Sequence, residues 1–118
     1  MRYLPSLPRH EKNGRPASIE AKIVYDADKL DSMGAIGIGR AFHFAGRIGA
    51  RVHNRQEEAL NNDSYTIEDT AFREYLVKLR HLQKHLLTAE GRRIGEQRSR
   101  FMEVFFQRLL SEAEPESG

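Results

Sequence analysis

Apolar residues recur at helical spacing along most of this chain, and no stretch shows the strict alternation of a half-buried strand. Ser18 is a good N-cap and Glu20 suits the positive end of a helix dipole, so we expect the first helix to begin there. The apolar positions of this helix are Ile19, Ile23, Val24, Ala27 and Leu30. They share one side, and this pattern predicts an amphipathic helix whose apolar side faces a core.

Three further helices are expected downstream. Residues 33–49 continue the helical pattern despite five glycines, whereas residues 50–69 are polar and are typical of a loop with one short helical turn. Residues 72–86 then carry the clearest amphipathic stripe, and a last helix is expected over about 92–113. The stripe consists of Phe72, Tyr75, Leu76, Leu79, Leu82 and Leu86. Together these patterns predict an all-α fold of about four helices.

The length of 118 residues fits one small domain, which we expect to cover residues 18–113. Three prolines predict an extended lead-in over residues 1–17, and residues 114–118 are expected to form a disordered tail. The chain has no cysteine, no apolar leader and no run long enough for a bilayer, so we expect a cytoplasmic protein without a membrane partner. Nineteen Lys and Arg against seventeen Asp and Glu give a net charge of +2, which makes nucleic acid an unlikely partner.

Three acids lie close together near the end of the first helix. A rotation of 100° per residue places Asp26 opposite the apolar side, where it would form surface pairs with nearby lysines. Asp31 falls among the apolar positions and Asp28 lies at their margin. Because a buried carboxylate needs a cation or strong donors, this pair predicts either a metal ion or a basic partner such as Arg40.

The string EAKIVYDADKLDSMGAIGIGRAF resembles the segment that closes the active site in small bacterial and archaeal members of the HD-domain phosphohydrolases. The sequence of the last two helices is also similar to the C-terminal helices of that family. In the family, a histidine, an adjacent His-Asp pair and a distant aspartate hold a divalent metal. The resemblance implies that Asp28, in Ala27-Asp28-Lys29-Leu30, is that distant ligand and that Asp31 lies beside it.

The same resemblance implies hydrolysis of a phosphate ester, with nucleotides as the usual substrates, by a bound metal that activates water. The resemblance does not specify which divalent metal, and Mn, Mg, Fe and Ni all remain candidates. Arg40 is a candidate for binding the substrate phosphate, and it could equally pair with Asp31. Lys29 is a second candidate, although the helical wheel places it on the side of the helix opposite the apolar positions.

The upstream ligands of the family are missing, because the chain contains no His-Asp dipeptide. The resemblance therefore predicts a truncated chain that corresponds to the C-terminal half of an HD-type domain. One carboxylate binds a divalent ion weakly, so activity would require ligands from a second chain. Whether the chain is an enzyme by itself stays open, and the alternative is a non-catalytic helical module that covers its apolar faces by forming a homo-oligomer.

Two other patterns have simpler explanations. The run Gly34-Ala35-Ile36-Gly37-Ile38-Gly39 could suggest a dinucleotide-binding turn, but a charged helix precedes it instead of a strand. Small residues at i, i+4 spacing, namely Ala41, Ala45 and Gly49, instead predict close helix packing. His81 and His85 lie four residues apart on a predicted helix without an acidic third ligand. We expect that pair to lie at the surface.

Overall fold

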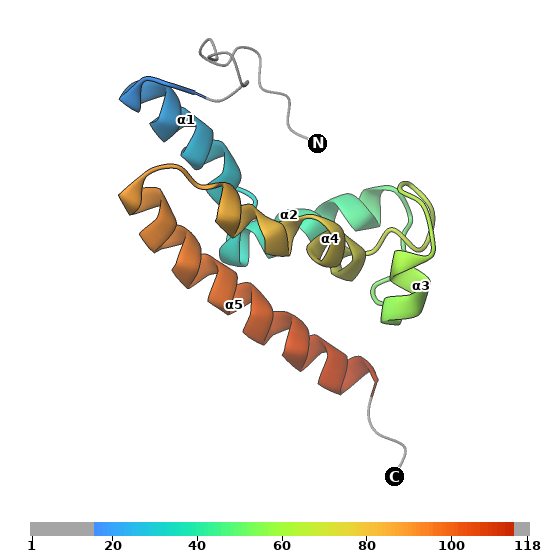
Figure 1. The fold of residues 1–118 in the computed structure, drawn as a ribbon. Coiled ribbons are helices and arrows are strands. Elements are labelled where there is room, and N and C mark those ends of the chain that lie inside the picture. Colours follow the sequence, from blue (N-terminus) through green and yellow to red (C-terminus); the bar gives the residue numbers. More distant parts are fainter. Residues whose placement is uncertain (1–15, 115–118) are drawn as a thin grey trace.

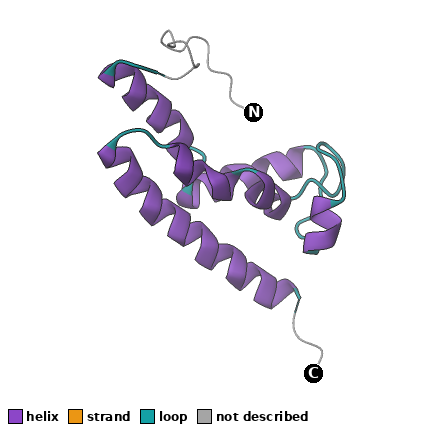
Figure 2. Ribbon diagram, viewed as in Figure 1, coloured by secondary structure: helices purple, strands orange, loops and turns teal. Residues whose placement is uncertain are grey.

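The computed structural model describes residues 16–114, and over this range helices are the only regular secondary structure, as predicted (Figures 1 and 2). The elements are α1 (Ile19–Leu30), α2 (Gly34–Arg47), α3 (Gln56–Leu60), α4 (Ala71–Val77), the 3-10 helix η1 (Leu79–His85) and α5 (Ala89–Ala113). The predicted lead-in lies almost wholly outside the described residues, and so does the predicted tail after its first residue. Among residues 16–114, no helix is long and apolar enough to cross a membrane.

Helix α1 begins where the sequence predicts. The Ser18 hydroxyl accepts a hydrogen bond from the Ala21 backbone N–H at 3.0 Å, which is the expected N-cap. The orientation predicted for this helix is wrong, however, because Ile19 and Ile23 are 58% and 54% exposed. The buried residues of α1 are Ala21 and Asp26, so a small side chain and a polar one make its closest contacts.

The buried Asp26 fixes α1 against the start of α5 and corrects the prediction that it lies at the surface. Its side chain is 3% exposed. The two carboxylate oxygens accept hydrogen bonds from the backbone N–H groups of Leu87 and Thr88, both at 2.8 Å, and from the Thr88 hydroxyl at 2.7 Å. The positive end of the α5 dipole also favours a carboxylate there. These donors replace the surface lysines expected from the helical wheel.

A second contact ties the other end of α1 to α5. Arg98 of α5 donates from its guanidinium to the backbone carbonyl of Leu30 at 2.8 Å. Since Asp26 and Leu30 flank Asp28, both sides of that residue on α1 are held by α5.

Helix α2 follows after a tight turn, and this turn requires the glycines at the start of the helix. Gly34 has a φ of +70°, and a Cβ on Gly37 would lie 2.3 Å from the Ser32 carbonyl group. Only glycine allows the turn to fold back this closely. The element before this run is a helix, so the dinucleotide-binding alternative has no support.

The amphipathic stripe predicted as one helix over 72–86 forms two elements. Helix α4 ends at Val77, and Lys78 has a φ of −135° that interrupts the helix before η1 begins. In a 3-10 helix, residues three apart share a side, so Leu79 and Leu82 are both buried after the break. His85 is exposed and His81 is half-buried, in agreement with the surface position expected for that pair.

The long helix α5 contacts α1, α2 and η1, and Figure 1 shows it running along one side of the molecule. It begins at Ala89, three residues earlier than predicted, because the Thr88 hydroxyl caps it. The buried core that it helps to form consists of Met33, Ile38, Ala59, Phe72, Leu76, Leu79, Leu82, Leu86, Met102 and Phe106. Tyr75 stacks on Phe106 with ring centroids 4.5 Å apart, and burial together with Glu103 raises the pKa of the Tyr75 phenol.

Candidate functional site

A cavity of about 690 Å³ opens between α1, α2, the loop before α4, and α4 itself. Helix α2 lines it with one face, because four of its residues recur at the spacing i, i+3, i+4 and i+7. These residues are Arg40, His43, Phe44 and Arg47. The opposite walls come from Asp28 of α1, Tyr65 and Asp69 of the loop, Glu74 of α4, and Lys78, which caps the end of α4.

Asp28 is half-buried and lines this cavity, where the resemblance to HD-type enzymes would place a catalytic carboxylate. Asp31 differs from its prediction. Its side chain is exposed rather than buried, because Asp31 is the C-cap of α1 and its backbone N–H closes the last turn onto Ala27. Asp31 is also absent from the residues that line the cavity.

The two predicted substrate-binding residues lie in different places. Arg40 is exposed, lines the cavity, and donates from its guanidinium to the backbone carbonyl of Asp31 at 3.3 Å. This bond uses one of its five N–H donors, so the guanidinium can still bind an anion. Lys29 does not line the cavity, and its ammonium group lies 4.8 Å from the centre of the Tyr25 ring.

Several cavity residues were not predicted. Lys78 and Glu74 form an ion pair at 3.9 Å, which offsets the charge of Lys78. Arg47, in contrast, makes no hydrogen bond or ion pair within the described range. The sequence could have predicted this wall from the helical spacing of Arg40, His43, Phe44 and Arg47. Nothing in the loop sequence predicted that Tyr65 lies at the cavity.

The described residues do not form a metal centre by themselves. Within 16–114, no group of three or more His, Asp or Glu side chains lies close enough together to hold a metal ion. Asp28 brings one carboxylate to the cavity, and a single carboxylate does not replace enough of the hydration shell of a divalent ion to bind it tightly. The metal expected from the family therefore does not fit this part of the chain alone.

Comparison with known proteins agrees with the HD-type resemblance. The uncharacterised protein YpgQ of Bacillus subtilis is 38% identical over 94 residues, which cover 80% of this chain and 40% of YpgQ. The crystal structure of YpgQ in complex with ADP is similar with a TM-score of 0.65 and 35% identity, over 85% of this chain and 46% of that one.

An HD-superfamily hydrolase from Bacillus thuringiensis is also similar, with a TM-score of 0.69 and 31% identity over 84% of this chain and 48% of that one. No protein-family profile matches the chain. The chain spans less than half the length of these relatives. It has an HD-like fold and is similar to HD-superfamily hydrolases.

Proposed function

We propose that this chain is the C-terminal half of an HD-type metal-dependent phosphohydrolase and provides one carboxylate and a phosphate-binding wall. The observation that carries this proposal is the cavity that places Asp28 and the arginine-bearing face of α2 around one space. The similarity to YpgQ, whose structure contains ADP, supports a nucleotide or another phosphate ester as the ligand.

The chemistry of the α2 wall suits a phosphate group. A guanidinium offers paired N–H donors that match two phosphate oxygens, and it stays charged at any physiological pH. Arg40 and Arg47 lie on the same face of α2, and Arg47 has no competing partner in the described chain. The acids on the opposite wall are less available to repel a phosphate, because Glu74 pairs with Lys78 and Asp69 pairs with Arg73 at 3.1 Å.

The catalytic part of the proposal requires ligands from outside residues 16–114. In an HD-type centre, a divalent metal would provide Lewis-acid chemistry at the phosphate, and Asp28 is the residue of this chain that we assign to it. The remaining histidine and aspartate ligands would belong to another segment or chain. Asp28 alone is therefore expected to bind metal weakly and to support no hydrolysis.

Binding is the direct test. Titration calorimetry with ADP and with inorganic pyrophosphate should detect both ligands, and Arg47→Ala should weaken both by about 10-fold, as expected for a charged hydrogen bond of about 1.5 kcal/mol. The matched control is Arg93→Ala, which removes an exposed arginine that pairs with Glu90 on α5 and does not line the cavity. Failure of both ligands to bind at millimolar concentration, or equal effects of the two substitutions, would refute the proposed wall.

The catalytic part has its own test. The DNA upstream of the Met1 codon, read in all frames, should encode a histidine and a His-Asp pair at helical spacing. Joining that segment to the chain should then produce manganese-dependent release of phosphate from nucleotides, and Asp28→Asn should abolish it. Hydrolysis that persists in Asp28→Asn would contradict the role assigned to this carboxylate.

A second candidate function is a non-catalytic module that forms a homo-oligomer. It is favoured by large apolar side chains that remain at the surface, namely Ile19 and Ile23 on α1 and Phe101 and Val104 on α5. A second copy of the chain would remove this surface from water. Light scattering over a range of concentrations tests this candidate, and a monomer that melts cooperatively would argue against it.

A further inference from the structure

The loop before α4 is held by a buried polar network, which we call the loop network and which consists of Asn54, Glu68, Asp69, Thr70 and Arg73. Asn54 is 2% exposed and donates to both the backbone carbonyl and the side chain of Glu68, at 3.0 and 2.8 Å. The Thr70 hydroxyl, which is fully buried, donates to the Asn54 side chain at 2.8 Å. Such a fully bonded network fixes the loop in one conformation.

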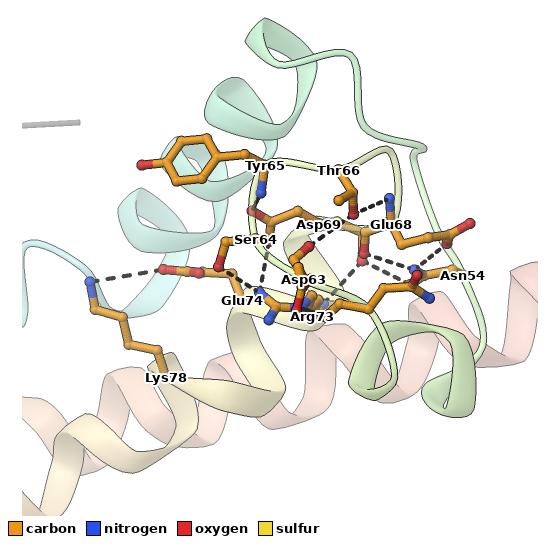
Figure 3. Close-up of polar contacts among 12 residues, drawn as sticks. Asn54, Asp63, Ser64, Tyr65, Thr66, Glu68, Asp69, Arg73, Glu74 and Lys78 are labelled. Carbon is orange, nitrogen blue, oxygen red and sulfur yellow. Dashed lines mark hydrogen bonds and ion pairs between the residues drawn. The ribbon is translucent and has the colours of Figure 1, made fainter.

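The other half of the loop network ends at Tyr65. Asp69 accepts a hydrogen bond from Arg73 with one oxygen at 3.1 Å, and with the other oxygen it accepts the backbone N–H of Tyr65 at 2.8 Å. Arg73 also donates to the backbone carbonyl of Asn62 at 3.1 Å. Figure 3 shows the Tyr65 nitrogen directed at Asp69 while the ring points away from the network.

Tyr65 is held in an unfavourable backbone conformation. Its φ is +64°, which only glycine and, to a lesser extent, asparagine adopt readily. A tyrosine in this region costs about 1 kcal/mol or more, and the contacts with Asp69 maintain it. The strain is not offset by burial of the ring, since the residue is 69% exposed.

The exposed ring lies at the cavity and beside a second aromatic residue. Tyr65 and Phe44 both line the cavity, with ring centroids 5.7 Å apart and planes at 78°. An edge-to-face pair leaves the Tyr65 ring available for a third planar group. Phe44 and Arg47 are three residues apart on the same face of α2, so the aromatic pair adjoins the proposed phosphate-binding wall.

We propose that Tyr65 determines ligand specificity by stacking on the aromatic ring of a phosphate-bearing ligand, which selects nucleoside phosphates over phosphates without a ring. This inference rests on the proposed function, because Arg40 and Arg47 hold the phosphate end. Tyr65 contributes its ring face, and the loop network fixes where that face lies. Stacking of a base on an aromatic side chain tolerates different bases, since every base has a π-face.

The test compares two ligands and two variants of Tyr65. Calorimetry with ADP and with inorganic pyrophosphate separates the ring from the phosphates. Tyr65→Asn should weaken ADP binding about 5- to 150-fold, the range for losing one stacked base, and should leave pyrophosphate binding unchanged. Tyr65→Phe should retain the affinity of the wild-type chain for both ligands, because the ring is preserved.

Tyr65→Asn is chosen because asparagine accepts a positive φ, so its melting temperature should equal or exceed that of the wild type. A large drop in melting temperature would show that the ring is needed for folding and would overturn the assignment. Equal ADP affinity in Tyr65→Asn and the wild type would also overturn the role of Tyr65. The proposed function would still be supported in that case if pyrophosphate binds. If neither ligand binds, the proposed function and this inference both fail.

Discussion

The strongest prediction concerns the junction of α1 and α5, where replacement of Asp26 by alanine should destabilise the fold by about 3 kcal/mol. The substitution removes the acceptor of three hydrogen bonds, two of them from the backbone N–H groups of Leu87 and Thr88. A partly buried donor left without a partner costs about 1–3 kcal/mol, and water that enters the vacated space recovers part of this. At about 4–8 °C per kcal/mol for a domain of this size, the melting temperature should fall by more than 10 °C.

Gly91 provides an independent check on the same junction. A Cβ at this position would lie 2.2 Å from an Asp26 carboxylate oxygen, so Gly91→Ala should destabilise the wild-type chain. In a helix without this contact, the same substitution stabilises by about 1 kcal/mol. In the Asp26→Ala background only the contact with the rotatable Thr88 hydroxyl, at 2.8 Å, remains, so Gly91→Ala should cost less than in the wild type and the two substitutions should be coupled in a double-mutant cycle.

Urea denaturation followed by circular dichroism measures all four members of the cycle. The control is Glu20→Gln, which neutralises an exposed acid on the same helix and should change stability by no more than about 0.5 kcal/mol. A loss below about 1 kcal/mol for Asp26→Ala, or additive effects of the two substitutions, would refute the view that Asp26 holds the two helices together.

Three further predictions concern stability. Gly37→Ala should destabilise the fold by more than about 2 kcal/mol, because the new Cβ would meet the Ser32 backbone. Gly39→Ala should stabilise it by up to about 1 kcal/mol, because nothing lies within 4 Å of its new Cβ. The midpoints of urea denaturation should therefore shift in opposite directions. Asn54→Ala should cost about 2–3 kcal/mol by the same assay, since it leaves buried groups of the loop network unpaired. Burial raises the pKa of Tyr75 above 10, so the native chain keeps a proton that the unfolded chain releases; stability should fall as the pH rises above about 10, and Tyr75→Phe should remove that part of the decline.

Helix positions could be predicted from the sequence more reliably than helix orientations. The predicted cap at Ser18 is local, because its hydroxyl bonds a backbone N–H three residues ahead, and the cap at Thr88, which was not predicted, has the same geometry. The orientation of α1 depends on contacts with α5, which is more than fifty residues away in sequence. A helical wheel considers only residues of one helix and cannot predict such contacts. The wheel treated isoleucines as buried and Asp26 as exposed, whereas the start of α5 presents hydrogen-bond donors that select the carboxylate.

The lining of the cavity was predicted in part. Asp28 was proposed from the family resemblance and Arg40 from the fit of a guanidinium to phosphate, and both line the cavity, while their roles stay predictions. The helical spacing of Arg40, His43, Phe44 and Arg47 was present in the sequence, but the glycines in the same helix were interpreted instead. The position of Tyr65 at the cavity could not have been predicted, because it depends on a backbone angle held by Asp69.

The supports of Asp28 and of Tyr65 are physically separate. Hydrogen bonds between α1 and α5 hold the helix that carries Asp28, whereas hydrogen bonds within residues 54–73 hold Tyr65. If Tyr65 selects the ligand as proposed, a substitution in this loop should alter which ligands are preferred without loosening the helix that carries Asp28.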